Sequence, residues 1–450
     1  MAHQHQGGGA HATTQGQAPK VVEGKYLVCF IMVTSLFALW GFANDITNPM
    51  VAAFKKILLI SNFESSLVQA AFYGGYCVMA IPAAIFIKRF SYKSGILLGL
   101  ILYAGAALFF PVAGAMMSFP AFLAAYFIMT CGLSFLETTS NPYILSMGDD
   151  RTATQRLNFA QAFNPMGSLT GMFIASELIL AKLNTATEEE RRLMLTTAPE
   201  KLKDIQKFDL DILQGPYFAI GLVVLFVFII FIFKKLPEAK AVENSELNFG
   251  PTLARLFSNK RYCEGVIAQA FYVGAQIMCW TFIIQYAANE LNWSAESAQR
   301  ANIVAMIIFC VSRFVCTFLL KFIQPGALLG FLALGGTALM LGTIYIQGIM
   351  GLYCLVGTSA CMSLMFPTIY GIALEGLGED AKLGAAGLIM AIGGGCLMPP
   401  LQGLIMDITD AAGKSMVCGM SSYRASFVLP LICFVVIAIF GYRVHKVHSK

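Results

Sequence analysis

Long apolar runs alternate with short polar segments along the whole 450-residue chain. Each run is roughly 20 residues or longer, enough for a helix to cross a hydrocarbon core of about 30 Å. The runs are continuous rather than alternating, which excludes a transmembrane β-barrel. The pattern predicts twelve helices, near residues 26–55, 65–87, 95–115, 119–147, 156–183, 215–234, 262–290, 297–321, 327–346, 349–376, 383–408 and 420–443.

A polar segment between the sixth and seventh runs divides the helices into two sets of six. The first residues of the chain are polar and glycine-rich without an apolar core, so we expect a disordered cytosolic tail rather than a signal peptide. The predicted units are a tail over 1–22, a first bundle over 23–236, a cytosolic linker over 237–258 and a second bundle with a short tail over 259–450.

Composition supports an all-α membrane protein. Hydrophobic residues make up 57% of the chain and charged residues only 12%, against roughly a quarter charged in soluble domains. The net charge of +5 does not indicate a nucleic-acid partner, because the basic residues lie mainly in short loops. The 12 cysteines are scattered without CxxC or Cys/His clusters, so we interpret them as packing residues and predict no metal site.

The distribution of basic residues predicts the orientation. They concentrate on one side, after the second, fourth and twelfth runs and in the linker, at Lys88, Arg89, Lys93, Arg151, Arg156, Lys234, Lys235, Lys240, Arg255, Lys260, Arg261, Arg443, Lys446 and Lys450. By the positive-inside rule this side is cytosolic, and both termini lie there. We therefore expect a multi-pass protein of the cell membrane that contacts the lipid bilayer and functions as a monomer.

Two acidic residues fall inside apolar runs. Asp45 lies in "ANDITNPM" and Glu137 in "LETTSNP". An ionised side chain at mid-membrane costs about 2.5–3.5 kcal/mol, so each acid needs a partner, water or a proton. One interpretation is structural, with each acid hydrogen-bonded where helices pack. The other is that at least one binds and releases a proton near neutral pH, because burial disfavours the carboxylate anion.

Amides and aromatic rings accompany these acids inside the runs. Amides offer donors and acceptors together, which suits sugar hydroxyls, and flat rings suit the C–H faces of a pyranose. Any one of them can also serve as a polar contact between helices. The predicted substrate-binding set is Asn44, Asn48, Glu137, Asn141, Gln161, Asn164, Gln269, Tyr272, Gln276, Trp280, Arg313 and Tyr370.

Arg313 admits two interpretations, since a buried guanidinium can pair an acid or bind hydroxyls, whereas one near a helix end can reach toward the cytosolic edge. The chain contains no nucleophile elbow, no HExxH and no phosphate-binding GxxxxGK[ST]. We therefore expect neither an enzyme nor an ATP-driven pump, and no cofactor other than a coupling ion.

Internal repetition points to an architecture. The acid followed by Asn-Pro recurs in the first and fourth helices, and "GDDRT" at 148–152 is echoed by "GEDAK" at 378–382. Inverted three-helix repeats within each of two six-helix bundles are typical of major facilitator transporters. The segments "AQAFYVGAQIMCW", "CGLSFLETTSNP", "RLNFAQAFNPMG", "MFPTIYG" and "GEDAKLGAAGLIMAIGGG" resemble the fucose permease family of that superfamily.

The resemblance, over about residues 26–440, implies uptake of a neutral monosaccharide, of the fucose or hexose class, by symport with an ion, usually a proton. It implies that Glu137 in "LET-x-x-NP" serves substrate binding and proton coupling. It also implies binding roles for matched residues in the fifth, seventh and eighth helices, namely Gln161, Asn164, Tyr272, Gln276, Trp280 and Arg313.

The first helix departs from the family pattern, because Asn48 occupies the place of the usual aspartate and the acid is Asp45. Residues three apart share roughly one helix face, so Asp45 can still serve the same site. The choice between Asp45 and Glu137 as main coupling acid stays open, as do Na⁺ coupling and the identity of the sugar. A drug:proton antiporter and a non-transporting sugar sensor are the alternative functions.

Overall fold

The computed structural model describes residues 22–148, 156, 159–237, 249–320, 322–377, 380–409, 416–417 and 419–446. The predicted tail over 1–22 lies almost wholly outside the described residues. Most of "GDDRT", the first two residues of "GEDAK" and the first part of the predicted linker also lie outside them.

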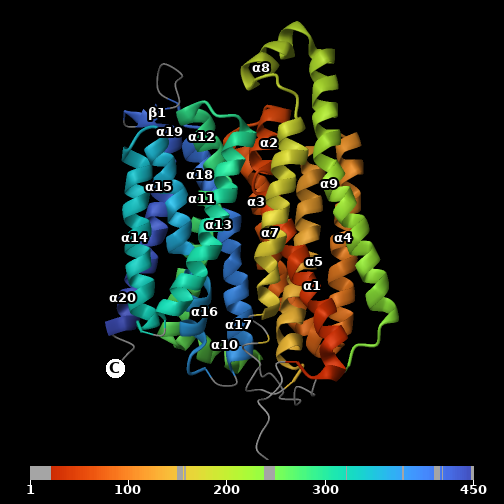
Figure 1. The fold of residues 1–450 in the computed structure, drawn as a ribbon, viewed down its shortest axis with the longest axis vertical. Helices are drawn as coiled ribbons and strands as arrows, with labels where there is room; N and C mark the ends of the chain where they lie inside the picture. Colours follow the sequence, from red (N-terminus) through yellow and green to blue (C-terminus); the bar gives the residue numbers. More distant parts are fainter. Residues whose placement is uncertain are drawn as a thin grey trace, which may run out of the picture.

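The described helices stand side by side in two groups (Figure 1). The first group begins with the short 3-10 helix η1 (Gly24–Tyr26) and includes the π-helix η3 (Ala175–Ile179) and the 3-10 helix η4 (Leu180–Lys182). Its α-helices are α1 (Leu27–Thr47), α2 (Met50–Leu58), α3 (Asn62–Arg89), α4 (Tyr92–Ala115), α5 (Phe119–Leu145), α7 (Phe163–Ile174), α8 (Glu188–Thr197) and α9 (Pro199–Phe233).

The second group contains the 3-10 helix η6 (Ala391–Gly393) and a small antiparallel pair of strands, β1 (Met416–Val417) and β2 (Met420–Ser421). Its α-helices are α10 (Phe249–Ser258), α11 (Lys260–Thr281), α12 (Ile283–Leu291), α13 (Ala295–Leu319), α14 (Pro325–Tyr345), α15 (Ile349–Met362), α16 (Met365–Leu374), α17 (Ala381–Met390), α18 (Gly394–Met406), α19 (Ser422–Ser426) and α20 (Val428–Lys446).

The predicted all-α membrane fold is confirmed, apart from the two short strands. Within the described residues, ten helices are long and apolar enough to cross a membrane, and the bent pair α11 and α12 makes an eleventh span. The consecutive segments α7, η3 and η4 run from Phe163 to Lys182 in the place of the predicted fifth helix. This arrangement is consistent with twelve spans.

Several predicted helices are interrupted along their length. The first breaks at Asn48-Pro49, because proline has no N–H to donate to the preceding turn. The seventh bends by 42° at Phe282, between α11 and α12. The eleventh passes through η6 at the glycine run of residues 393–395.

One predicted boundary was wrong. The sixth helix begins at Pro199 rather than near 215, because the polar residues before the apolar run continue the same helix beyond the span. The second part of the predicted linker forms α10, which packs Leu256 against Tyr262 and Leu383 of the second group. A hydrogen bond from Arg255 also ties α10 to Asp380 and holds the pKa of that carboxyl below its usual value.

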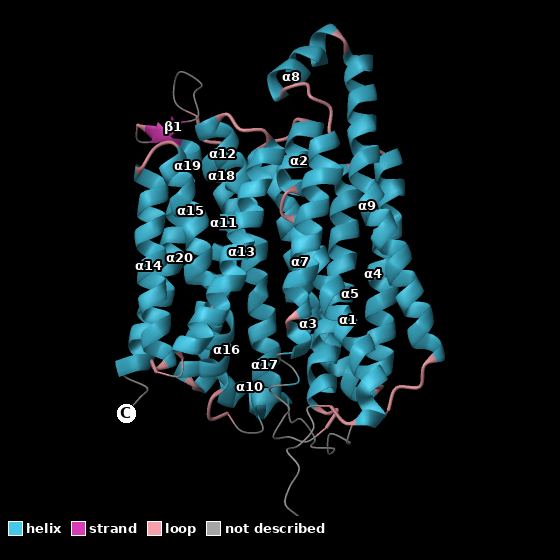
Figure 2. Cartoon of the chain, in the orientation of Figure 1, coloured by secondary structure: helices cyan, strands magenta, loops and turns pink. Residues whose placement is uncertain are grey.

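Two opposite faces carry the loops (Figure 2). The linker face, at the bottom of Figure 1, carries the start of α1, α10 and the end of α20. The α8 face, at the top, carries α2, α8, α12, α19 and β1.

A buried ion pair folds α8 back against α9. The Arg191 guanidinium lies 2.6 Å from the Asp209 carboxylate, and both side chains are fully buried. Asp209 also accepts a hydrogen bond from the Asn184 backbone N–H at 2.7 Å. Thr187 and Glu190 close the start of α8 as a capping box.

Asp209→Asn should destabilise this part of the chain strongly. The substitution keeps the volume but leaves the buried Arg191 charge uncompensated, a loss of about 3–5 kcal/mol in the free energy of unfolding. Thermal unfolding of purified protein measures it. Glu200→Ala is the matched control, because its exposed pair with Lys203 contributes at most about 1 kcal/mol. Equal melting temperatures for both variants would contradict the assignment.

Candidate functional site

The two groups of helices meet mainly through α3, α7, α13, α17 and α18. Glycines allow the closest approach along α3. A Cβ atom on Gly403 would lie 2.7 Å from the Asn62 carbonyl oxygen, and one on Gly395 would lie 2.8 Å from the Tyr73 ring. The polar residues predicted from the sequence lie on the helices that form this interface or directly behind it.

The interface is held together by polar contacts at the α8 face. Both carboxylate oxygens of Asp407, at the end of α18, accept hydrogen bonds from the first turn of α3, including the Asn62 and Phe63 backbone N–H groups at 3.0 and 2.8 Å. An acid at a helix N-terminus is favoured by the unpaired N–H groups and the helix dipole. Arg300 of α13 also lies 3.5 Å from Glu177 of η3.

Asp45 lies in a buried polar cluster close to this interface. Its Oδ1 accepts a hydrogen bond from Asn48 Nδ2 at 3.0 Å, and Asn48 Oδ1 accepts one from Gln69 Nε2 at 3.0 Å. Gln69 Nε2 also donates to Thr281 Oγ1 at 2.9 Å, across to the second group. Asp45, the acid of this helix, and Asn48, which fills the place of the family's usual aspartate, are therefore direct hydrogen-bond partners.

Glu137 lies in a second polar environment, on α5. Tyr76 of α3 lies within hydrogen-bonding reach of this carboxyl, which also interacts electrostatically with Tyr370 of α16 in the second group. Asn141, one turn further along α5, donates from Nδ2 to the Glu137 backbone oxygen at 3.1 Å. On α3, Tyr76 stacks on Tyr73, with ring centroids 6.4 Å apart, and Tyr73 in turn interacts with Asp45.

The two acids lie at different depths. Asp45 is near the end of α1, about 27 Å along that helix from the linker face, at a rise of 1.5 Å per residue. Glu137 is about 12 Å from the linker-face end of α5, which runs in the opposite direction. Asp45 is thus nearer the α8 face and Glu137 nearer the linker face.

Two predicted residues on the fifth span occupy different settings. Gln161 is exposed and donates from Nε2 to Asn141 Oδ1 at 3.3 Å, which brings it to the Glu137 side of the interface. Asn164 instead packs against α1, where its amide oxygen lies 2.6 Å from Nε1 of Trp40 and accepts a hydrogen bond from that ring. Asn164 therefore contributes to the contact between α7 and α1.

Three predicted residues in the second group have their polar atoms bound within that group. The Tyr272 hydroxyl donates to the Met362 oxygen at 3.1 Å, and Trp280 Nε1 donates to Ser359 Oγ at 3.1 Å. Arg313 Nε donates to the Ser363 oxygen at 3.1 Å, at the break between α15 and α16. These contacts fix the orientation of the side chains. The ring faces of Tyr272 and Trp280 remain available for packing against neighbouring groups. Gln276 is half-buried on the same helix as both rings.

Some buried polar atoms make no hydrogen bond within the described residues. Among the predicted residues these are both polar side-chain atoms of Gln269 and the Asn44 amide oxygen. A buried polar group without a partner costs roughly 1–3 kcal/mol, so such atoms indicate where a polar ligand or water binds. They come from α1 and α11, one on each side of the interface.

Sequence reasoning missed Gln69 and Ser168. Gln69 links the Asp45 cluster to the second group, and Ser168 of α7 lies within hydrogen-bonding reach of Asp45. The available signal was a glutamine inside the apolar run of α3, of the same kind that identified Gln269. Ser168 carried no such signal, because serine is common wherever helices pack closely in membranes.

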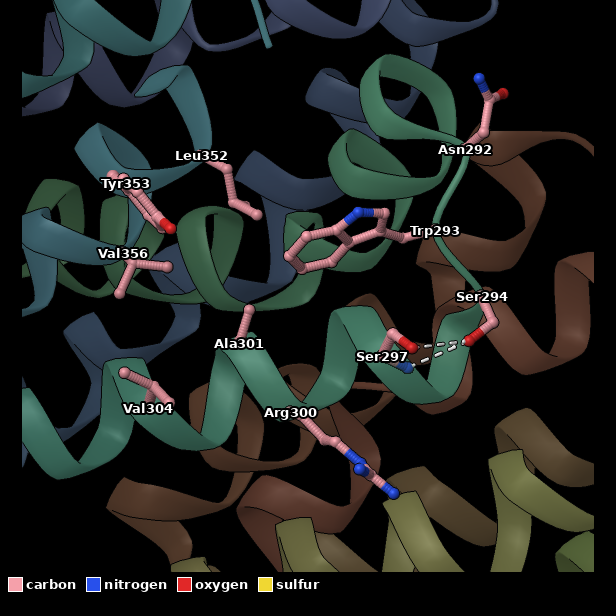
Figure 3. Close-up of a pocket in the computed structure, with 10 residues that line it drawn as sticks. All are labelled: Asn292, Trp293, Ser294, Ser297, Arg300, Ala301, Val304, Leu352, Tyr353 and Val356. Carbon is pink, nitrogen blue, oxygen red and sulfur yellow. Dashed lines mark hydrogen bonds between the residues drawn. The ribbon is translucent and has the colours of Figure 1, made fainter. Parts of the chain in front are cut away.

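A separate pocket of about 690 Å³ opens where α13 begins (Figure 3). Its lining comes from α13, α15 and the segment before α13, and includes Trp293, Arg300 and Tyr353. Ser294 and Ser297 bond to each other there and cap the helix. None of the predicted substrate-binding residues lines it, and it belongs to one group of helices alone.

Comparisons with known proteins identify the family of the chain. Residues 31–399 match the profile of the Major Facilitator Superfamily. The chain is 55% identical to an L-fucose-proton symporter of Haemophilus influenzae over 431 residues, covering 95% of this chain and 99% of that protein. It is 34% identical to the L-fucose-proton symporter of Escherichia coli over 421 residues, covering 92% and 93%.

Among solved structures, the Escherichia coli fucose:proton symporter matches with a TM-score of 0.69 at 34% identity, over 93% of this chain and 98% of that chain. A D-xylose-proton symporter matches with a TM-score of 0.67 at 13% identity, over 92% and 97%, and shares the fold. The identity to the symporters extends over nearly the whole length of both partners. The chain belongs to the fucose permease family of the major facilitator superfamily.

Proposed function

We propose that this chain is a secondary transporter that imports a neutral monosaccharide, with L-fucose as the first candidate, by proton symport with alternating access. The 55% identity to a protein named as an L-fucose-proton symporter carries this proposal. The linker face is cytosolic in it, as the basic residues predict. The carrier works as a monomer in the cell membrane, and it catalyses no chemical conversion.

The sugar binds between the two groups of helices. Its hydroxyls use the buried amide groups that lack partners, on Gln269 and Asn44, and the Tyr76 hydroxyl beside Glu137. Glu137 and Asn141 complete the site toward the cytosol, and Gln161 lies on its edge. An analogue that lacks one of these hydroxyls leaves a buried polar group of the site unpaired. The site therefore discriminates strongly against such an analogue.

Proton coupling uses the two buried acids. Asp45 is nearer the outer face and accepts a hydrogen bond from Asn48, and Glu137 is nearer the cytosolic face, within hydrogen-bonding reach of Tyr76. A proton enters together with the sugar, and the α8 face then closes through the contacts of Asp407 with the start of α3. The proton and the sugar afterwards leave to the cytosol. The contacts at the α8 face fit the closed side of such a cycle.

A thermal-shift panel tests the substrate and the coupling ion. Purified protein is heated with L-fucose, D-galactose, D-glucose and an amino sugar at two pH values, with and without Na⁺. We expect L-fucose to stabilise most, by about 2–3 kcal/mol at roughly 100 times its Kd, and the shift to depend on pH but not on Na⁺. Stabilisation by lipophilic cations and by no sugar would replace this proposal with a drug:proton antiporter.

A further inference from the structure

Four buried side chains form one hydrogen-bonded chain from Asp45 to the opposite group of helices. Asn48 donates to Asp45 at 3.0 Å, and Gln69 Nε2 donates to Asn48 at 3.0 Å and to Thr281 at 2.9 Å. Gln69 and Thr281 are fully buried. Three helices contribute, since Asp45 is on α1, Gln69 on α3 and Thr281 on α11.

The chain has a fixed direction. Because Gln69 gives its amide N–H₂ to the Asn48 oxygen, Asn48 must turn its own N–H₂ toward Asp45. The last bond in the chain is therefore a donor aimed at a carboxyl oxygen. Such a bond is about twice as strong to a carboxylate as to a neutral acid. The strength of the chain depends on whether Asp45 carries a proton.

The far end of the chain lies at a bend. Thr281 is the last residue of α11, and the span turns by 42° at the next residue before continuing as α12. Gln69 lies two turns inside α3 from the first turn that Asp407 holds. The hydrogen bond between Gln69 and Thr281 therefore connects the bend in the second group to α3 of the first group, the helix whose first turn is held by Asp407.

We propose that Gln69 and Thr281 are positioning residues that transmit the protonation state of Asp45 to the closure of the α8 face. This inference rests on the proposed proton symport. The other titratable groups facing Asp45 in the described part of the chain are Tyr73 on α3 and Cys310 on α13, which belong to the same interface. Without the two positioning residues, sugar still binds, but proton occupancy no longer governs closure.

The test uses Gln69→Met and Thr281→Val in proteoliposomes, with radiolabelled L-fucose. Thr281→Ser keeps the hydroxyl. Thr343→Val is the matched control, because the hydroxyl of that buried threonine, among the contacts described, donates only to Leu339 of its own helix. Two quantities are measured for each: fucose exchange as a function of pH, and accumulation under an imposed pH gradient.

We expect Gln69→Met and Thr281→Val to lower gradient-driven accumulation about fivefold or more, the effect of losing a typical hydrogen bond. Their exchange should persist with a pH midpoint displaced by about half a unit or more, and Thr281→Ser and Thr343→Val should match wild type within about twofold. If a variant also loses exchange, the pH profile of L-fucose binding to the purified protein is compared instead. If both variants keep the wild-type pH profile and wild-type coupling, the proposed role of Gln69 and Thr281 is wrong. If the wild-type carrier itself does not couple protons to sugar, the proposed function is wrong.

Discussion

Proteoliposomes containing Glu137→Gln will not concentrate L-fucose. For one proton per sugar, a gradient of one pH unit supplies about 1.36 kcal/mol and sustains about tenfold accumulation by the wild-type carrier. Glutamine can still hydrogen-bond a sugar but cannot bind a proton, so the gradient does no work and the accumulation ratio falls to about one. Uptake of labelled L-fucose under an imposed pH gradient measures it.

The control for this experiment is Glu264→Gln. That glutamate is paired with Arg443 on the linker face, outside the interface, so its loss should leave the accumulation ratio within about twofold. A Glu137→Gln carrier that still accumulates L-fucose nearly tenfold would remove Glu137 from the coupling mechanism.

The Asp45→Asn carrier should exchange L-fucose across the membrane but accumulate it poorly. An asparagine at this position can still accept the hydrogen bond from Asn48, so the packing and the sugar site are kept while a titratable group is lost. We expect exchange within about threefold of wild type and an accumulation ratio close to one. Exchange and accumulation are measured on the same vesicles.

The double substitution Asp45→Asn/Asn48→Asp provides an informative comparison. It moves the acid by three residues to the position that the family pattern favours, beside the Gln69 amide that already donates there. We expect accumulation to recover to at least half of wild type. If the double variant accumulates L-fucose no better than Asp45→Asn alone, positions 45 and 48 are not equivalent for coupling. Their shared helix face then does not explain why the acid of this chain stands at position 45.

Much of the fold was predictable because a bilayer restricts the possible structures. Apolar runs of about 20 residues must be helices, since every backbone group has to be satisfied within the segment. The runs predicted the spans well. The breaks were harder to locate: Asn48-Pro49 is a recognisable signal, whereas the bend at Phe282 has neither proline nor glycine beside it. The start of α9 was misplaced because hydropathy reports where the membrane ends and not where the helix does.

The site was predictable in its residue types and only partly in its contacts. Asp45 and Glu137 stood out because charge is rare in apolar runs, and "NDITNP" and "LETTSNP" appeared equivalent. The structure shows how they differ. The first and fourth helices run in opposite directions, so the same motif places one acid nearer each face.

Side-chain partners could not be read from spacing. Trp280 and Asn164 matched the pattern of sugar-binding residues, yet their polar atoms bond to Ser359 and toward Trp40. Gln69, which joins the Asp45 cluster to the opposite group, has no neighbour in sequence that reveals this role. Such contacts depend on the angle at which two helices cross, which no single run determines.

The most direct test of the account is the pH outside de-energised vesicles when L-fucose is added. Proton symport predicts an immediate alkalinisation that needs no Na⁺, that a protonophore abolishes, and that is absent with Glu137→Gln. Entry of L-fucose with no change in external pH, or with a change that requires Na⁺, would contradict proton-coupled sugar import by this chain.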